Sequence, residues 1–160
     1  MPGRTDNEIV IAAPVDVVWE MTNDLESWPT LFSEYERVDI LERDGDRVRF
    51  RLTMHPEPDG TVWSWVSERR TDPVTRTVHA KRIETGPLLE FMHLFWEYHE
   101  VDGGTRLRWI QQFEMKPSAP VDNEGAARHL NEQTRNEMRH IKEVIERQVA
   151  GAHDPAGTAA

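Results

Sequence analysis

The segment richest in reactive side chains is residues 62–70, which read Val-Trp-Ser-Trp-Val-Ser-Glu-Arg-Arg. Alternate side chains of an extended strand point to opposite faces, so one face here carries Trp63, Trp65, Ser67 and Arg69. A dry core rejects an unpaired charge, and a solvated surface seldom carries two tryptophans. The pattern therefore favours the wall of a ligand cavity. The alternative is that both tryptophans are core residues and that Arg69 lies beyond the strand end in water.

Neighbouring segments place more polar and aromatic side chains on the same inward face. Taken by alternation within each segment, the further inward residues are Phe50, Leu52, Met54, Arg82, Glu84, Leu94, Trp96, Tyr98, Trp109 and Gln111. Burying unpaired charges in a dry core would cost several kcal/mol each, and a wet cavity removes most of that cost. Aromatic walls suit a flat, partly unsaturated ligand that carries many oxygens. The alternative is ordinary ion pairs at strand ends, either Arg82 with Glu84 or Arg69 with Glu68.

Other catalytic chemistries find little support in the sequence. The seven histidines show neither metal-ligand spacing nor a His-Glu-x-x-His motif. Four of them fall at positions expected to be solvated, namely His79, His93, His129 and His140. Ser67 has no nucleophile elbow and no nearby histidine or aspartate, and there is no glycine-rich phosphate loop. We therefore expect neither a bound metal nor a cofactor.

Composition narrows the class of protein. The 160 residues suffice for one domain with a sizeable core. A formal net charge of -10 argues against nonspecific binding to nucleic acid or to an anionic membrane, because both depend on a basic surface. No apolar run reaches transmembrane length and the first residues lack a signal-peptide core, so we expect a soluble cytoplasmic protein. The lack of cysteine excludes disulfides, a thiolate nucleophile and cysteine-based zinc sites.

The elements that would position these residues follow a simple order. A first strand is predicted over 7–12, followed by a helix that Pro14 opens, and then by a short helix or turn over 24–33 that is broken at Pro29. Alternating patterns separated by Asp-Gly, Asp-Pro and Gly-Pro turns predict six more strands, at residues 36–43, 47–55, 61–70, 76–84, 91–100 and 105–116. A long helix over 121–149 carries an apolar stripe at helical spacing.

Together these elements predict one α+β domain over residues 1–150. A strongly curved, antiparallel, seven-stranded sheet would wrap around the long C-terminal helix, with two short helices after the first strand. A helix laid across a curved sheet leaves room at one end, which is the predicted interior cavity. Residues 151–160 are expected to form a disordered tail. Outward-facing arginines would make a basic stripe on which an acidic protein could dock, namely Arg47, Arg49, Arg51, Arg106 and Arg108.

Several motifs occur together along nearly the whole chain. They include Thr5-Asp6-Asn7-Glu8, Ser27-Trp28-Pro29, Leu31-Phe32-Ser33-Glu34-Tyr35, Glu84-Thr85-Gly86-Pro87, Trp96-Glu97-Tyr98 and, most specific, Trp63-Ser64-Trp65-Val66-Ser67-Glu68-Arg69. On these residues the sequence resembles the aromatase/cyclases of bacterial type II polyketide synthases, and among them single-domain members such as the tetracenomycin and spore-pigment cyclases. The resemblance implies the helix-grip fold of the Bet v 1-like and START-like superfamily.

The resemblance also implies an activity and its partners. A poly-β-keto chain on an acyl carrier protein, made by a minimal polyketide synthase, would enter the cavity, close its first ring between C9 and C14 by aldol condensation, and lose water. In such relatives the residue that matches Arg69 has the central catalytic role. We accordingly predict Arg69, Tyr35 and Ser67 as catalytic. The predicted substrate-binding residues are Trp28, Phe32, Glu34, Phe50, Met54, Trp63, Trp65, Arg82, Glu84, Trp96, Tyr98, Trp109, Gln111 and Asn131. A homodimer is a further option.

Physical chemistry limits what Arg69 can do. Because a guanidinium titrates above about 12, using it as a general base near neutral pH would cost on the order of 7 kcal/mol. We therefore expect Arg69 to hold and polarise a substrate oxygen, while Ser67 and Tyr35 donate to neighbouring oxygens and Tyr35 or water relays protons. Two other functions stay open. One is a noncatalytic carrier of a hydrophobic small molecule, and the other is a cofactor-free dehydratase or different cyclase on the same scaffold.

Overall fold

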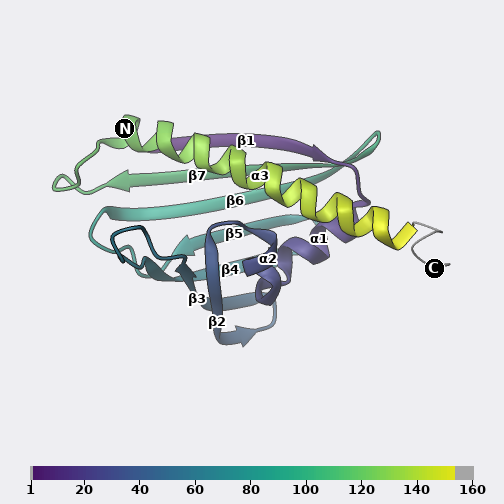
Figure 1. Ribbon diagram of the computed structural model, residues 1–160, viewed down its shortest axis with the longest axis horizontal. Helices are drawn as coiled ribbons and strands as arrows, with labels where there is room; N and C mark the ends of the chain where they lie inside the picture. Colours follow the sequence, from purple (N-terminus) through teal and green to yellow (C-terminus); the bar gives the residue numbers. More distant parts are fainter. Residues whose placement is uncertain (1, 154–160) are drawn as a thin grey trace.

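One long helix crosses a curved antiparallel sheet, and two shorter helices lie on the same side of that sheet (Figure 1). This computed structural model describes residues 2–153. The strands are β1 (Gly3–Ile11), β2 (Tyr35–Asp44), β3 (Arg47–Met54), β4 (Ser64–Asp72), β5 (Thr77–Arg82), β6 (Leu89–Val101) and β7 (Gly104–Met115). The helices are α1 (Val15–Asn23), the single 3-10 turn η1 (Leu25–Ser27), α2 (Trp28–Leu31) and α3 (Asn123–His153). The predicted α+β helix-grip fold is confirmed.

Strands β2 to β7 form a meander, and β1 adds to it as an edge strand beside β7. The strand order is β1-β7-β6-β5-β4-β3-β2, and all neighbours are antiparallel. The register places Ser67 opposite both Phe50 and Arg82, and Trp65 opposite Leu52. Directly opposed residues share a face of the sheet, so these side chains project together toward the helices. The alternation of the sequence thus sets which residues can line the interior.

The short helices supply aromatic residues to the interior. Pro14 directly precedes α1, where its fixed φ suits a helix start. Pro29 lies in the first turn of α2, and both Trp28 and Leu31 are buried. The segment is broken as predicted, but the break lies between Ser27 of η1 and Trp28 of α2, so that Pro29 falls in a first turn, where a proline removes no helical hydrogen bond. None of the helices that the described residues form is long and apolar enough to cross a lipid bilayer.

The long helix α3 packs along β1 and β7 (Figure 1). Met138, Ile141 and Ile145 form its buried stripe. Asn123 Oδ1 accepts from the Met115 amide at 2.8 Å, and Glu146 accepts from the Ala12 amide at 2.7 Å, so contacts near both ends tie it to the sheet region. The helix continues to residue 153, past the predicted end at 149. The remainder of the predicted disordered tail, 154–160, lies outside the described residues.

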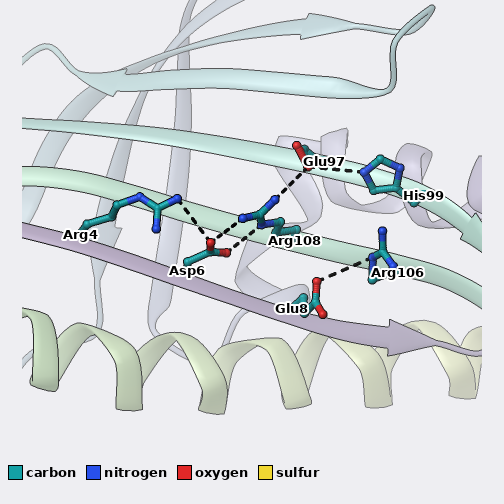
Figure 2. A network of polar contacts seen from close by, with 7 residues as sticks. All are labelled: Arg4, Asp6, Glu8, Glu97, His99, Arg106 and Arg108. Atoms are coloured by element: carbon teal, nitrogen blue, oxygen red, sulfur yellow. Dashed lines mark hydrogen bonds and ion pairs between the residues drawn. The ribbon is translucent and has the colours of Figure 1, made fainter.

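The outward arginines form an ion-pair lattice in place of the predicted basic stripe. Arg108 lies between Asp6 at 2.5 Å and Glu97 at 3.6 Å, and Arg106 lies 3.7 Å from Glu8 (Figure 2). On the other half of the sheet, carboxylates lie within 3.3 Å of the remaining members, Arg47, Arg49 and Arg51. The prediction failed because alternation places arginines on the outer face but does not reveal the acidic residues on the neighbouring strands.

Candidate active site

An interior cavity of about 590 Å³ lies between the sheet, α2 and α3. This volume is within the range typical of small-molecule sites. Exposed residues such as Glu57, Pro87, Val121 and His129 lie at its mouth, and buried residues lie at its inner end. The predicted site residues that line it are Trp28, Phe32, Glu34, Tyr35, Phe50, Met54, Trp63, Trp65, Ser67, Arg69, Arg82, Trp96, Trp109 and Gln111.

Arg69 lies at the inner end of the cavity between two indoles. Its guanidinium carbon is 5.2 Å from the ring centre of Trp28 and 4.9 Å from that of Trp96, and the residue is 3% exposed. Nε and Nη2 donate to Asn23 Oδ1 at 3.1 and 2.9 Å, which fixes the plane of the group from the protein side. Burial lowers the pKa of Arg69, but the indole faces and the amide oxygen favour its charged form. Arg69 is therefore a fixed cationic donor in an aromatic chamber.

Three polar side chains lie beside this chamber, and one of them has a buried atom without a partner among the described residues. The indole nitrogen of Trp109 is buried and makes no hydrogen bond to any described residue. Gln111 Oε1 accepts from Thr5 at 2.7 Å and from Thr134 at 3.2 Å, which orients its amide group beside the cavity. Ser67 is 5% exposed and also lines the cavity. A buried donor without a partner costs free energy, so a ligand oxygen near Trp109 would satisfy it.

Arg82 supplies a second cation to the cavity wall. Its guanidinium lies 3.9 Å from the ring centre of Trp65 and, among the described residues, has no carboxylate within ion-pairing distance. Burial lowers the pKa of Arg82 to about 10, so it stays charged at neutral pH. The Tyr35 ring packs against Trp65 and Trp28, and burial raises the pKa of its hydroxyl. Tyr35 is therefore a neutral hydroxyl that can donate or accept.

Two carboxyl groups lie close together where α2, β2 and α3 meet. Glu34 accepts from Gln133 Nε2 at 2.7 Å. Glu137 is 2% exposed and accepts from the Ser33 amide at 2.9 Å and from the Ser33 hydroxyl. Burial, reinforced by repulsion from Glu137, raises the pKa of Glu34 to about 7. Glu34 thus titrates near neutral pH at the wall of the cavity.

Replacing Glu34 by glutamine should change how stability depends on pH. Because its pKa is about 4.5 unfolded and about 7 folded, the folded protein binds more protons between these values and loses stability as pH rises through them. Ionisation should remove roughly 3 kcal/mol of the free energy of unfolding. Glu34→Gln should therefore be the more stable protein at pH 8, as measured by urea unfolding from pH 4 to 8.

The control for this experiment is Glu36→Gln, since Glu36 is exposed and next to the site in sequence. This variant should unfold with the same pH dependence as the parent protein. Parallel stability curves for Glu34→Gln and the parent protein across the whole pH range would show that Glu34 does not have the raised pKa assigned to it.

Glu84 lies outside the cavity, which corrects the sequence prediction. Its carboxylate faces outward, lies 3.1 Å from Arg51 Nη2 and is 50% exposed. The cause is a local irregularity after β5, where the amides of both Ile83 and Glu84 donate to the Val66 carbonyl. Two residues of one strand thus oppose one of the other, so the alternation that held through Arg82 reverses its face.

Tyr98 and Asn131 are also absent from the cavity lining. Tyr98 follows the predicted alternation, but its hydroxyl lies 2.6 Å from the Thr22 hydroxyl in the packed core. Asn131 accepts from Asn7 Nδ2 of β1 at 2.9 Å. It was misplaced because the helix turns about 100° per residue, which directs position 131 toward β1 although Leu130 faces the cavity.

Several cavity residues on α3 were not predicted. The helix contributes Ala126, His129, Leu130, Gln133 and Thr134 to the lining. Positions 126, 130 and 134 follow the spacing of a single helix face, so this signal was present in the sequence. His129 was expected in solvent and is exposed, yet it borders the mouth of the cavity. Gln133 was missed because a polar residue on a polar helix gives no sign of facing inward.

Sequence comparison is consistent with this geometry. Residues 2–146 match a family model described as polyketide cyclase/dehydrase and lipid transport. The chain belongs to this family. Two relatives of the polyketide cyclase/dehydrase family carry the name "putative polyketide cyclase". One, from Streptomyces cyaneus, is 54% identical over 146 residues, which are 91% of this chain and 95% of that protein. The other, from Streptomyces halstedii, is 62% identical over 110 residues, which are 69% of this chain and all of that protein.

Solved structures give the same fold for this polyketide cyclase/dehydrase family member. The Zhui aromatase/cyclase from Streptomyces sp. R1128 superposes with a TM-score of 0.81 and 23% identity. The match covers 96% of this chain and 99% of that one. At this identity the superposition establishes the shared helix-grip architecture. The chemistry must be argued from the cavity itself.

Proposed function

We propose that this protein is a polyketide aromatase/cyclase of a type II polyketide synthase. It would receive a poly-β-keto chain on an acyl carrier protein, close the first ring between C9 and C14, and release water to form an aromatic ring. The observation that carries the proposal is the buried Arg69 guanidinium at the inner end of an aromatic cavity. A cation fixed in this position suits a ligand with an anionic or strongly polarised oxygen.

The cavity walls would act first, by restricting the conformations of the bound poly-β-keto chain. A poly-β-keto chain can cyclise in many ways, so the main task is to bring one carbon pair together. Trp28, Trp65, Trp96 and Trp109 supply flat walls, and proximity within such a chamber replaces a search through free conformations. Trp109 and Gln111 offer polar groups to the ketone oxygens.

Arg69 would act on the bond-forming step. The α-protons of the poly-β-keto chain lie between two carbonyls and are already acidic. The reaction therefore needs stabilisation of the enolate oxygen more than it needs a strong base. The guanidinium can donate to this oxygen without first rearranging, because Asn23 and the two indoles already hold the group in place. The enolate carbon then attacks the second carbonyl, which becomes an alkoxide that takes up a proton, and elimination of that hydroxyl with a neighbouring α-proton releases water.

Tyr35 would relay protons in these steps. Its hydroxyl is neutral and lines the cavity near both arginines. Tyr35→Phe should lower the rate of ring formation by about tenfold to a hundredfold, less than the loss of Arg69, because water can substitute in a relay. The measurement is the initial rate of first-ring product in a reconstituted synthase. A fall in rate as large as that of an Arg69 variant would show that the relay role is wrongly assigned to Tyr35.

The proposal is tested by product identification. A minimal polyketide synthase is incubated with and without the protein, and the products are separated and identified. We expect one C9–C14 first-ring product with the protein and a mixture of spontaneous cyclisation products without it. An unchanged mixture would refute the proposed function.

The carrier function is the second candidate, because the matching family includes lipid transport. Apolar lining would suffice for carrying a lipid, and the inward charges of Arg69 and Arg82 favour catalysis over that role. Tryptophan fluorescence distinguishes the two functions. Quenching by aromatic polyphenols but not by fatty acids is expected for the cyclase, and the reverse for a carrier.

A further inference from the structure

A second hollow, of about 530 Å³, lies on the outer face of the sheet, opposite the interior cavity. Its floor includes Phe95 and Ile110, which the register places side by side on β6 and β7. Basic side chains border this floor, namely Arg4, Arg70, His79, Lys81 and His93. The outer hollow therefore combines an apolar floor with a cationic border, in a protein whose formal net charge is -10.

The strand register explains how the basic residues converge. His79 lies opposite Arg70 and also opposite Phe95, and its ring centre is 4.6 Å from that of Phe95. In the adjacent row, Lys81 lies opposite His93. Two neighbouring rows across three strands thus place four basic side chains around one aromatic ring.

The cations around the outer hollow differ in their acidic neighbours. Arg4 lies 3.4 Å from Asp6 (Figure 2), and Lys81 lies opposite Glu68 in the strand register. Glu68 is the one carboxylate among the lining residues, and its Oε1 already accepts from Arg47 at 3.0 Å and from Arg49 at 3.3 Å. Within the described part of the chain, neither Arg70 nor Lys81 has a carboxylate within ion-pairing distance. Arg106 and Arg108, farther along β7, each lie beside an acidic side chain (Figure 2).

We propose that the outer hollow binds an organic phosphate that carries a flat ring. Arg70 and Lys81 would hold the phosphate oxygens, with His79 and His93 donating from the centre of the site. The ring would lie on Phe95 and Ile110. This site goes beyond the proposed cyclase function and does not depend on it, because a sheet separates it from the interior cavity.

The chemistry of the lining selects this ligand class. A carboxylate offers two oxygens and one negative charge, whereas a terminal phosphate offers three free oxygens and more charge, so several separate cations suit the phosphate better. An inorganic anion would make no favourable contact with the apolar floor, whereas a flat ring can stack on the aromatic ring there. A volume of about 530 Å³ also exceeds the need of a single phosphate ion.

The test uses the full chain, labelled for two-dimensional NMR, and three probes. ADP carries both a diphosphate and a flat ring, pyrophosphate carries only the charge, and adenosine carries only the ring and sugar. We expect ADP to bind most tightly and to shift the signals of residues 79, 81, 93 and 95. The cavity residues 28, 67 and 96 should not respond. Binding should weaken as salt is added, because the exposed charges are screened.

The decisive variant is Arg70→Glu with Lys81→Glu, which should weaken ADP binding at least tenfold. The matched control is Arg128→Glu, because Arg128 is an exposed arginine on α3 outside both sites. Folding of each variant is checked by its thermal melt. The proposal is overturned if ADP fails to bind, if adenosine or pyrophosphate binds as tightly as ADP, if the shifts fall on the cavity residues, or if the double variant binds like the control.

Discussion

Arg69→Ala should lower the rate of regiospecific first-ring formation by about a hundredfold to a thousandfold, which is the usual cost of removing one preorganised donor to a developing oxyanion. The variant loses the cation that lies between Trp28 and Trp96 and leaves Asn23 Oδ1 without its donor. Spontaneous cyclisation of the released chain should then dominate the products. The measurement is the product distribution of a reconstituted synthase with each protein.

Two further variants separate charge from folding. Arg69→Lys keeps a positive charge but cannot donate to Asn23 through two nitrogens, so we expect a partial recovery of regiospecific product. Arg37→Ala removes an exposed arginine of β2 and should leave both activity and product unchanged. Near-ultraviolet circular dichroism verifies that each variant keeps its packed aromatic core. Regiospecific product from folded Arg69→Ala would exclude the assigned role.

Gly104→Ala should destabilise the fold more than any other glycine-to-alanine change on an exposed turn. Gly104 begins β7 with φ of 150°, and a Cβ there would lie 2.0 Å from the Ile11 carbonyl oxygen at the end of β1. That oxygen belongs to the backbone, so the two strands must separate to make room. We expect a loss of at least about 3 kcal/mol, or roughly 6 to 12 °C in melting temperature for a domain of this size.

The matched control for this variant is Gly45→Ala. Gly45 also has a positive φ, of 59°, but nothing lies within 4 Å of a Cβ built there. The cost should therefore be only about 1 kcal/mol, from backbone conformation alone. Equal melting temperatures for the two alanine variants would show that the close approach of Gly104 to the Ile11 carbonyl does not limit which residue position 104 can hold.

The fold was predictable because its signals are local. Turn dipeptides such as Asp44-Gly45 and Asp102-Gly103 separate the alternating segments, and the strand ends in the structure lie within a few residues of the predicted ones. The irregularity after Arg82 was not predictable in this way, since it depends on one carbonyl accepting two amides. The pairing of outer arginines with acids was missed for the same reason, because it depends on register between strands.

The site was predictable where it rests on strand alternation. Residues 65, 67 and 69 line the cavity together with residues 50 and 52 of β3 and residues 80 and 82 of β5, because the register preserves their shared face. The contact between Glu34 and Gln133 joins residues 99 positions apart, and no local pattern in either segment points to the other. The shifted pKa of Glu34 follows from that long-range packing. The residues of the cavity walls were therefore predictable from the sequence, whereas the raised pKa of Glu34 was not.

The pairing of β1 with β7 also bears on how the chain acquires its structure. Gly3 lies opposite Phe113 and Ile11 opposite Thr105, so strands β2 to β6 all lie between the two partners in sequence. Hairpins within the meander join neighbours and can form early, whereas closing so long a loop costs more entropy. We therefore expect β1 to pair later than the hairpins of the meander, and its docking onto β7 completes the sheet beside α3.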